Sequence, residues 1–282
     1  MKKLTVLCIA ILVIQISQIE AQQAIWATSF AEAELYASTV DNEGNVYAGG
    51  LFYSTISLDG FELTNGTPNA AGWITKHDKN GTPKFLELVY ATEYLVVLDM
   101  EPLAEGGILI CGIFIGKAWL GDFIFGNESD NNYRGFVAKY NADGECTAAY
   151  ASDETQSVYF YALSQDEEAN IFIAGAAEGF FDFGVTEVDH SGDSDAIYGK
   201  MEADLNPLWM KSIGGADYDF ANEITVDVDG NIIISGSHEG MFEEDSYFFD
   251  SYGSSDIFVV KTDANGFIEW NQNMGSASGD GY

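Results

Sequence analysis

The chain has 282 residues, of which 45 are Asp or Glu and only 11 are Lys or Arg, so its formal net charge is −34 at pH 7. A surface this acidic repels nucleic-acid phosphates and anionic lipid headgroups. We therefore expect no nucleic-acid partner and no membrane insertion of the mature chain.

The N-terminus has the pattern of a secretory signal peptide. Two lysines precede an apolar stretch over 4–16, and a cleavage site is expected after Ala21. The apolar stretch is too short for a transmembrane helix, and a retained membrane anchor is the alternative. Removing residues 1–21 leaves 22–282 as the exported chain, with 9 basic and 44 acidic side chains.

Residues of three kinds recur at a fixed distance along the mature chain. Four lysines lie 63, 61 and 61 residues apart, and four glycines lie 63, 63 and 61 residues apart. An aromatic residue follows the lysine by nine positions in three of the four copies, and the second copy has Ala148 there. A fixed period of this length indicates a repeat architecture. The recurring residues are Lys76, Lys139, Lys200 and Lys261; Gly49, Gly112, Gly175 and Gly236; and Phe85, Trp209 and Trp270.

Each copy contains four short strand signals. Runs such as 232–234 are apolar without alternation, which indicates strands buried on both faces. Four-stranded sheets packed face to face around an axis bury both faces, as in a β-propeller. We therefore predict an all-β propeller of four-stranded blades, with about four repeats of 61–63 residues in the single domain 22–282. The blades are expected at about 27–90, 91–150, 151–211 and 212–271, with the start of a further blade at 272–282; the strands of the last copy are expected at Glu223–Asp227, Asn231–Ser235, Ile257–Thr262 and Phe267–Asn271.

The connections between these strands differ in length. Tight turns of the Asn-Gly or Asp-Gly kind join strands three and four in three copies, whereas the third copy has Leu205 in place of the glycine. About twenty residues separate strands two and three, and plain loops of that length are rare in compact domains. We expect each long connection to contain a short extra strand, near the apolar residues at 61–63, 123–125, 180–183 and 247–249.

The two ends of the repeat array predict an open or strained propeller. Ile25-Trp26 resembles a lone fourth strand, yet the last complete copy already has its own fourth strand ending at Trp270. A small closed ring of four blades is the alternative. We also expect Trp209 and Trp270 to be largely buried against the neighbouring blade.

The anchors of the last copy resemble the β-propeller repeats of secreted bacterial proteins, known as SBBP repeats. The resemblance is carried by Asp227, Gly230-Asn231 and Ile232 to Gly236, then by Asp256 to Asp263, Gly266 and Trp270. It covers the chain from Trp26 to the end, and it implies an exported protein, secreted or on the cell surface of a Gram-negative bacterium. Such repeats share no common chemistry, so the resemblance implies the fold and not the function.

The recurring lysines admit two interpretations. In so acidic a chain, a lysine at one position of every copy favours a structural ion pair with a carboxylate on a neighbouring strand. A ring of lysines that binds a ligand is the alternative, because structural ion pairs and sites share the same residues. The third-strand lysines are therefore predicted to be structural anchors, together with Trp209 and Trp270.

One face of the propeller is predicted to bind a ligand. The long connections and the links between blades open on the same face, opposite the tight turns. This face carries an acidic cluster beside a tyrosine, for which we expect calcium or a basic partner to be the ligand, with an ordinary solvated surface as the alternative. The candidate binding residues are Asp189, Asp193, Asp217, Tyr218 and Asp219.

No constellation of catalytic residues is present in the sequence, and no Cys/His cluster has metal-binding spacing. The predicted function is a binding or scaffold module for a protein or a glycan, with no cofactor other than calcium. The alternatives are an extracellular enzyme, such as a polysaccharide lyase or hydrolase, and a surface adhesin. An aromatic platform with scattered carboxylates would favour glycan binding, whereas a convergent acid and base in one funnel would favour the enzyme.

Overall fold

The structure, a computed structural model, describes residues 33–277 except 154, 185 and 189. The expected signal peptide, the Ile25-Trp26 strand and Asp189 lie outside the described residues. The described part is all-β without a helix, and its main elements are four antiparallel four-stranded sheets that follow one another along the chain. Sheet 1 is β1 Ala33–Val40, β2 Val46–Phe52, β5 Ala71–His77 and β6 Pro83–Ala91; sheet 2 is β7 Tyr94–Pro102, β8 Ile108–Ile115, β11 Arg134–Tyr140 and β12 Cys146–Ala151; sheet 3 is β13 Val158–Gln165, β14 Ile171–Ala177, β17 Asp195–Met201 and β18 Pro207–Ile213; sheet 4 is β19 Phe220–Val226, β20 Ile232–His238, β23 Asp256–Thr262 and β24 Ile268–Met274.

The four strands expected in the last copy are present as β19, β20, β23 and β24. The last of them runs to Met274, so residues 272–274 complete sheet 4, and the expectation that they begin a further blade is wrong. Aspartate fixes the tight turns: the Asp227 carboxylate accepts the backbone N–H groups of Asp229 and Asn231. This arrangement holds the turn without a metal ion.

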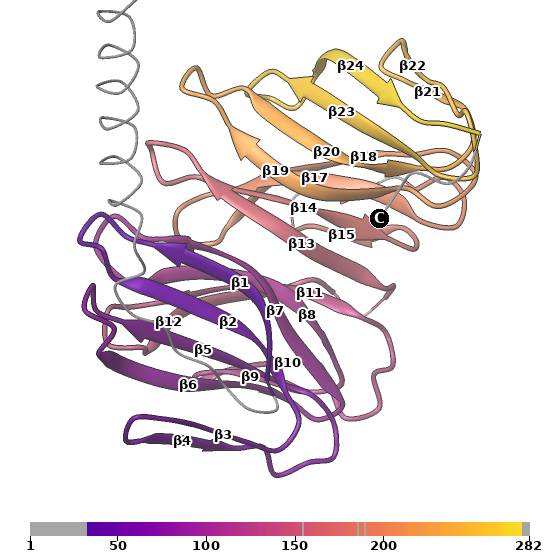
Figure 1. The fold of residues 1–282 in the computed structure, drawn as a ribbon. Coiled ribbons are helices and arrows are strands. Elements are labelled where there is room, and N and C mark those ends of the chain that lie inside the picture. The colour runs from indigo at the N-terminus through magenta and orange to yellow at the C-terminus, as the bar shows by residue number, and fades with distance from the viewer. Residues whose placement is uncertain (1–32, 154, 185, 189, 278–282) are drawn as a thin grey trace, which may run out of the picture.

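The sheets stack face to face in chain order, with sheets 1 and 2 in the lower half of Figure 1 and sheets 3 and 4 in the upper half. We call the face of each sheet that meets the next sheet its forward face, and the opposite face its backward face. Three buried apolar clusters fill the three gaps between consecutive sheets. Burial on both faces explains why the central strands are continuously apolar.

Each long connection contains a two-stranded hairpin, where the sequence predicted one extra strand. Phe181, Phe183 and Val188 from the third hairpin belong to the cluster between sheets 2 and 3, so this hairpin thickens the core on the backward face of its own sheet. The β9–β10 hairpin also pairs with β6 and so extends sheet 1. The hairpins are β3 Thr55–Leu58 with β4 Phe61–Thr64, β9 Ala118–Leu120 with β10 Phe123–Phe125, β15 Phe181–Asp182 with β16 Glu187–Val188, and β21 Phe242–Glu244 with β22 Tyr247–Phe249.

The recurring glycines sit opposite a β-bulge that occurs in the first strand of every sheet. A Cβ atom on Gly112, Gly175 or Gly236 would overlap a carbonyl oxygen of the bulged strand, so only glycine fits there. In sheet 1 the equivalent residue is Gly50 and not Gly49, because Gly50 lies three residues past the partner of the lysine, as in the other sheets. The glycine and carbonyl pairs are Gly50 with Glu34, Gly112 with Val96, Gly175 with Tyr159 and Gly236 with Phe220.

At two of the three junctions, the recurring aromatic residue packs on a glycine of the next sheet. Phe85 packs on Gly144, and Trp209 packs on Gly266, each glycine being the last residue of the second tight turn in the following sheet. The second copy reverses the sizes: Ala148 replaces the aromatic residue and packs against the cluster that contains Leu205, which replaces the glycine. A large aromatic residue therefore packs on a glycine at two junctions, and at the third a small residue packs against the cluster that contains Leu205.

The burial prediction is wrong for Trp270, which lies on a fourth strand as expected but is 40% exposed. Trp209 is half-buried, because sheet 4 supplies Gly266 beneath it. The described residues contain no sheet in front of sheet 4, so nothing equivalent covers Trp270.

Cys111 and Cys146 are free thiols. They lie on β8 and β12, and β11 runs between these two strands in sheet 2. Strands two apart in a sheet lie ~10 Å from each other, which is too far for a disulfide.

Two turn residues in the third copy adopt a left-handed backbone for different reasons, and this gives a paired prediction. Ala169 (φ 64°) is only partly buried, whereas Leu205 (φ 69°) is buried between sheets 2 and 3. Ala169→Gly should raise the free energy of unfolding by about 0.5–1 kcal/mol, because glycine relieves the strain. Leu205→Gly should lower the free energy of unfolding by about 2 kcal/mol or more, because the lost packing of the leucine side chain outweighs the relief of backbone strain. Urea unfolding of the two variants measures both, and equal stabilisation by both would refute the packing role of Leu205.

Candidate functional site

A hollow of about 370 Å³ lies where the first strands of sheets 2, 3 and 4 come together. Five tyrosines and a phenylalanine provide most of its lining. The lining residues come from β7, β8, β13, β19 and the connections beside them: Tyr94, Ile113, Tyr133, Tyr159, Tyr161, Glu178, Ser194, Tyr218 and Phe220.

The two central tyrosines lie at the bulge in β13. Phe160 and Ala162 pair with adjacent residues of β14, so the intervening Tyr161 is the extra residue of the bulge. Tyr159 and Tyr161 are two residues apart and therefore share one side of the strand, and both line the hollow with their rings stacked at 5.8 Å between centroids and 25° between planes. Bulges are frequent beside functional sites. Gly175 is the residue that makes room for the bulge.

The aromatic rings form two groups of contacts that line the hollow together. Tyr133 lies 5.1 Å from Tyr159 and meets Tyr94 edge-on at 6.3 Å. Tyr218 and Phe220, at the start of β19, are stacked at 6.3 Å with nearly parallel planes. Half-buried rings held by their neighbours offer a broad apolar contact at little cost in side-chain entropy.

Three of the tyrosine hydroxyls in the lining, those of Tyr94, Tyr159 and Tyr161, have raised pKa values and so keep their protons. Tyr159 Oη donates to Glu178 Oε1 at 2.8 Å. Burial, followed by the nearby phenols and Glu34, raises the pKa of Tyr94 to about 12. Burial is also the main cause of the raised pKa values of Tyr159 and Tyr161, with Glu178 adding to both. The hollow therefore combines apolar ring faces, neutral donors and one carboxylate.

The predicted acidic cluster adjoins this hollow. The long connection before β17 and the link before β19 meet there, because Ser194 N–H donates to the Asp217 carbonyl and Asp219 N–H donates to the Ser194 carbonyl. Tyr218, between them, lines the hollow. Asp193 and Asp217 are exposed, whereas Asp219 is fully buried. Of the predicted binding residues, only Tyr218 is part of the lining, and Asp189 lies outside the described residues.

Asp219 holds the backbone of these links in place. Its carboxylate accepts the N–H of Gly215 at 2.8 Å and that of Glu239 at 3.2 Å. Burial raises the pKa of Asp219 to about 7, and the negative charges of Asp195 and Asp217 contribute to the increase. Among the residues that the structure describes, no group of three or more His, Cys, Asp or Glu could hold a metal ion. The calcium hypothesis stays a prediction.

The recurring lysines make two kinds of contact. Lys200 and Lys261 pair with Asp166 and Asp227, the first residues of the turns on neighbouring strands, at 3.6 and 3.0 Å. Lys76 and Lys139 instead donate to carbonyls in the turn of the next sheet, those of Ala142 and Ala203. The first kind is the ion pair that the sequence favoured, and the second kind links consecutive sheets.

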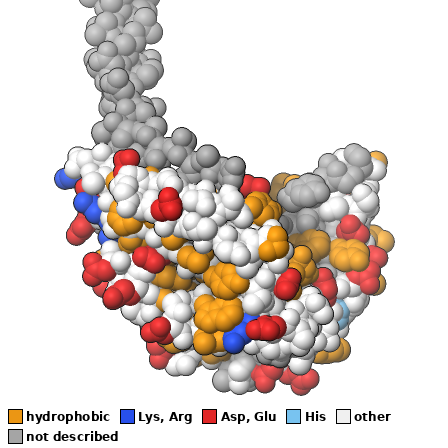
Figure 2. Space-filling model, turned by 90° about the horizontal axis from the view of Figure 1, so that it is seen from below, with side chains coloured by type: hydrophobic (Ala, Val, Ile, Leu, Met, Phe, Trp, Pro, Cys, Tyr) orange, Lys and Arg blue, Asp and Glu red, His pale blue; other side chains and the backbone are white. Residues whose placement is uncertain are grey.

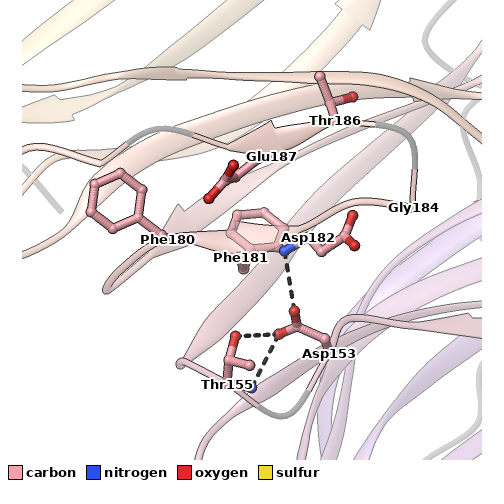
Figure 3. Close-up of a pocket in the computed structure, with 8 residues that line it drawn as sticks. All are labelled: Asp153, Thr155, Phe180, Phe181, Asp182, Gly184, Thr186 and Glu187. Atoms are coloured by element: carbon pink, nitrogen blue, oxygen red, sulfur yellow. Dashed lines mark hydrogen bonds between the residues drawn. The ribbon is translucent and has the colours of Figure 1, made fainter.

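A second hollow, of about 510 Å³, lies beside the β15–β16 hairpin (Figure 3). Its carboxylates come from Asp153, Asp182 and Glu187, and Phe180 closes one side. Asp153 is engaged within the protein, because it accepts the N–H and the hydroxyl of Thr155 and the N–H of Asp182. The hollow therefore offers little free hydrogen-bonding capacity from Asp153 and only two aromatic rings.

Acidic side chains are spread widely over the face shown in Figure 2, where lysines and arginines are few and the molecule is hollowed into a crescent. Such a surface favours neutral or cationic ligands. Among the described residues, no helix has the length and apolar character needed to cross a bilayer.

Sequence reasoning identified Tyr218 but missed the other tyrosines. The available signal was compositional: the chain contains 15 tyrosines, and several fall at or near first strands. Tyr94, the first residue of β7, and Tyr218, two residues before β19, occupy equivalent places in the second and fourth copies.

No protein-family model matches the chain, and no curated protein matches it. Among solved structures, it is similar to a protein of unknown function from Bacteroides caccae, with a TM-score of 0.36 and 11% identity over 90% of this chain and 87% of that chain. It is also similar to Morganella morganii TcdA4, with a TM-score of 0.31 and 10% identity over 82% of this chain. This chain spans only 11% of TcdA4. Neither likeness carries an argument about function.

The raised pKa of Asp219 predicts how stability depends on pH. The folded-state pKa of about 7 exceeds the ordinary value of 3.8, so the folded chain holds this proton more tightly than the unfolded chain. The resulting stabilisation is fully present below the unfolded pKa and is lost as the pH rises through about 7. Asp219→Asn should remove this loss from thermal melts recorded between about pH 4 and pH 8. Asp193 provides the control, because it is exposed and is not among the charges that raise the pKa of Asp219. Asp193→Asn should keep the wild-type profile, and identical profiles for all three proteins would contradict the assignment.

Proposed function

We propose that this chain is an exported β-propeller of the SBBP-repeat type, secreted or displayed on the cell surface, and that it binds a neutral oligosaccharide in its tyrosine-lined hollow. Four consecutive four-stranded sheets stacked face to face, with their first strands side by side, support the propeller assignment. The recurring lysine, glycine and aromatic positions support the repeat type.

The tyrosine surface is the observation that carries the proposed ligand. The flat face of a pyranose ring presents C–H groups that pack on aromatic rings, while its hydroxyls hydrogen-bond to groups at the ring edges. Tyr159 and Tyr161 offer stacked rings, and the phenol hydroxyls and Glu178 offer polar contacts at their edge. The volume of about 370 Å³ is within the range of small-ligand sites.

The negative charge in and near the hollow limits which oligosaccharides can bind there. Glu178 lines the hollow, Asp217 and Glu34 lie near it, and the lining contains no lysine or arginine. An anionic sugar would meet uncompensated negative charge, so uronic and sialic acids are disfavoured. A neutral glycan meets no such cost.

Binding of residues 22–282 to an array of neutral and acidic oligosaccharides tests the proposal. We expect neutral oligosaccharides to bind and acidic ones to be rejected. Isothermal titration of the best neutral ligand should then show about tenfold weaker binding for Tyr159→Ala, because one aromatic contact of about 1.4 kcal/mol is lost.

Two further variants sharpen this test. Tyr161→Phe keeps the stacked ring and should bind more tightly than Tyr161→Ala. Tyr252 is exposed and outside the hollow, so Tyr252→Ala should bind like the wild type. The proposal fails if no neutral glycan binds, or if Tyr159→Ala binds as well as Tyr252→Ala.

A further inference from the structure

Sheet 1 carries a second group of two tyrosines and one glutamate. Tyr36 belongs to β1, and its hydroxyl donates to Glu34 Oε2 at 2.9 Å. Tyr53 follows directly after β2. The hydrogen bond to Glu34, followed by burial and by the neighbouring phenol of Tyr53, raises the pKa of Tyr36. Both rings are about half exposed, at 49% for Tyr36 and 51% for Tyr53. We call Glu34, Tyr36 and Tyr53 the sheet 1 triplet.

The sheet 1 triplet occupies the same three positions of the repeat as the centre of the tyrosine-lined hollow. Tyr36 in β1 and Tyr161 in β13 are both the extra residue of the bulge in the first strand. The other two positions follow from the register of the first and second strands. The equivalent pairs are Glu34 with Tyr159, Tyr36 with Tyr161, and Tyr53 with Glu178. We call the second member of each pair, together, the sheet 3 triplet.

The two triplets have the same composition, although the glutamate changes its place. In sheet 1 it lies on the first strand, and in sheet 3 it follows the second strand. In each triplet a tyrosine hydroxyl donates to the carboxylate: Tyr36 to Glu34 at 2.9 Å, and Tyr159 to Glu178 at 2.8 Å. Equivalent positions of a repeat face the same side of the array. The two rings and one carboxylate that support sugar binding in the hollow therefore occur twice.

Tyrosines of sheet 2 connect the two triplets. The first strands β1, β7, β13 and β19 follow one another along the row of sheets, and each contacts the next one (Figure 1). Besides burial, all three members of the sheet 1 triplet raise the pKa of Tyr94, as does Tyr133. Tyr133 in turn lies 5.1 Å from Tyr159 between ring centroids. These three tyrosines also pack on one apolar cluster, which consists of Leu51, Ala70, Val96 and Ile113.

We propose that the sheet 1 triplet is a second sugar subsite, and that the ligand is a neutral polysaccharide chain that crosses the first strands of sheets 1 to 3 and occupies both triplets. This inference rests on the glycan-binding function proposed above and deepens it. Sheets packed face to face lie about 10 Å apart, so triplets on sheets 1 and 3 are separated by up to roughly 20 Å. A disaccharide therefore fills one triplet, whereas a longer chain reaches both. Joining the two binding events in one ligand increases its affinity.

Calorimetric titration of residues 22–282 with oligosaccharides of increasing length tests the proposal. The probes are the di- to octasaccharides of the cello-, xylo-, manno- and laminari-series, which are all neutral. We expect the octasaccharide of the best-binding series to form a one-to-one complex. Its affinity should exceed that of the disaccharide of the same series at least about tenfold, because it engages the second triplet as well.

Tyr36→Ala separates the contributions of the two triplets. The ring is half exposed, so the variant should fold like the wild type, which circular dichroism checks. It should bind the octasaccharide about tenfold more weakly and the disaccharide unchanged, because the hollow stays intact. Tyr53→Ala should behave in the same way. Tyr252 is exposed and belongs to neither triplet, so Tyr252→Ala should leave both affinities as they are.

Tyr159→Ala distinguishes failure of this inference from failure of the proposed function. The second subsite is overturned if Tyr159→Ala weakens binding but affinity does not rise with chain length. It is also overturned if Tyr36→Ala binds the octasaccharide as well as Tyr252→Ala does. In both cases the glycan-binding function stands. Absence of binding in every series, at every length, overturns the function and the second subsite together.

Discussion

Burial of both faces of the two middle sheets is the constraint on which the rest of the structure depends. Strands β8 and β14 are apolar and buried along nearly their whole length, so sheets 2 and 3 each need a neighbour in front and a neighbour behind. The side chains meet in register because a large residue on one fourth strand faces a small residue in the next turn, as with Phe85 and Gly144. Lysines strengthen two of the three junctions by donating to carbonyls in the turn of the next sheet.

The same stacking creates the candidate site. Bringing the sheets together places their first strands side by side, and the bulge in each first strand changes the side on which the following residues lie. In β13, Tyr159 and Tyr161 line the hollow together, and in β19 the strand begins with Phe220 beside Tyr218. The recurring glycine is a requirement of the fold, because without Gly175 the bulge would not fit.

The all-β sheets, the four strands of the last copy and the unbridged cysteines could be predicted from the sequence, because each depends on local pattern or on strand order. The equivalence of Gly50 to the other recurring glycines could not be predicted. From the first copy to the second, the second strands are offset by one residue less than the third strands, so the spacing of the lysines selects Gly49 instead. The tyrosines were missed because their common lining depends on how the first strands of three sheets meet, which the pattern of one strand does not show. Trp270 was misjudged because its burial depends on a neighbouring sheet and not on its own strand.

A double-mutant cycle at the junction of sheets 1 and 2 tests the packing account most directly. Phe85→Ala and Gly144→Leu would be made singly and together, and the free energy of unfolding of each protein would be measured in urea. The account predicts that each single change destabilises the chain and that the double variant loses about 1–3 kcal/mol less than the sum, because Ala beside Leu reproduces the pairing of residues 148 and 205. Strict additivity of the two changes would contradict it.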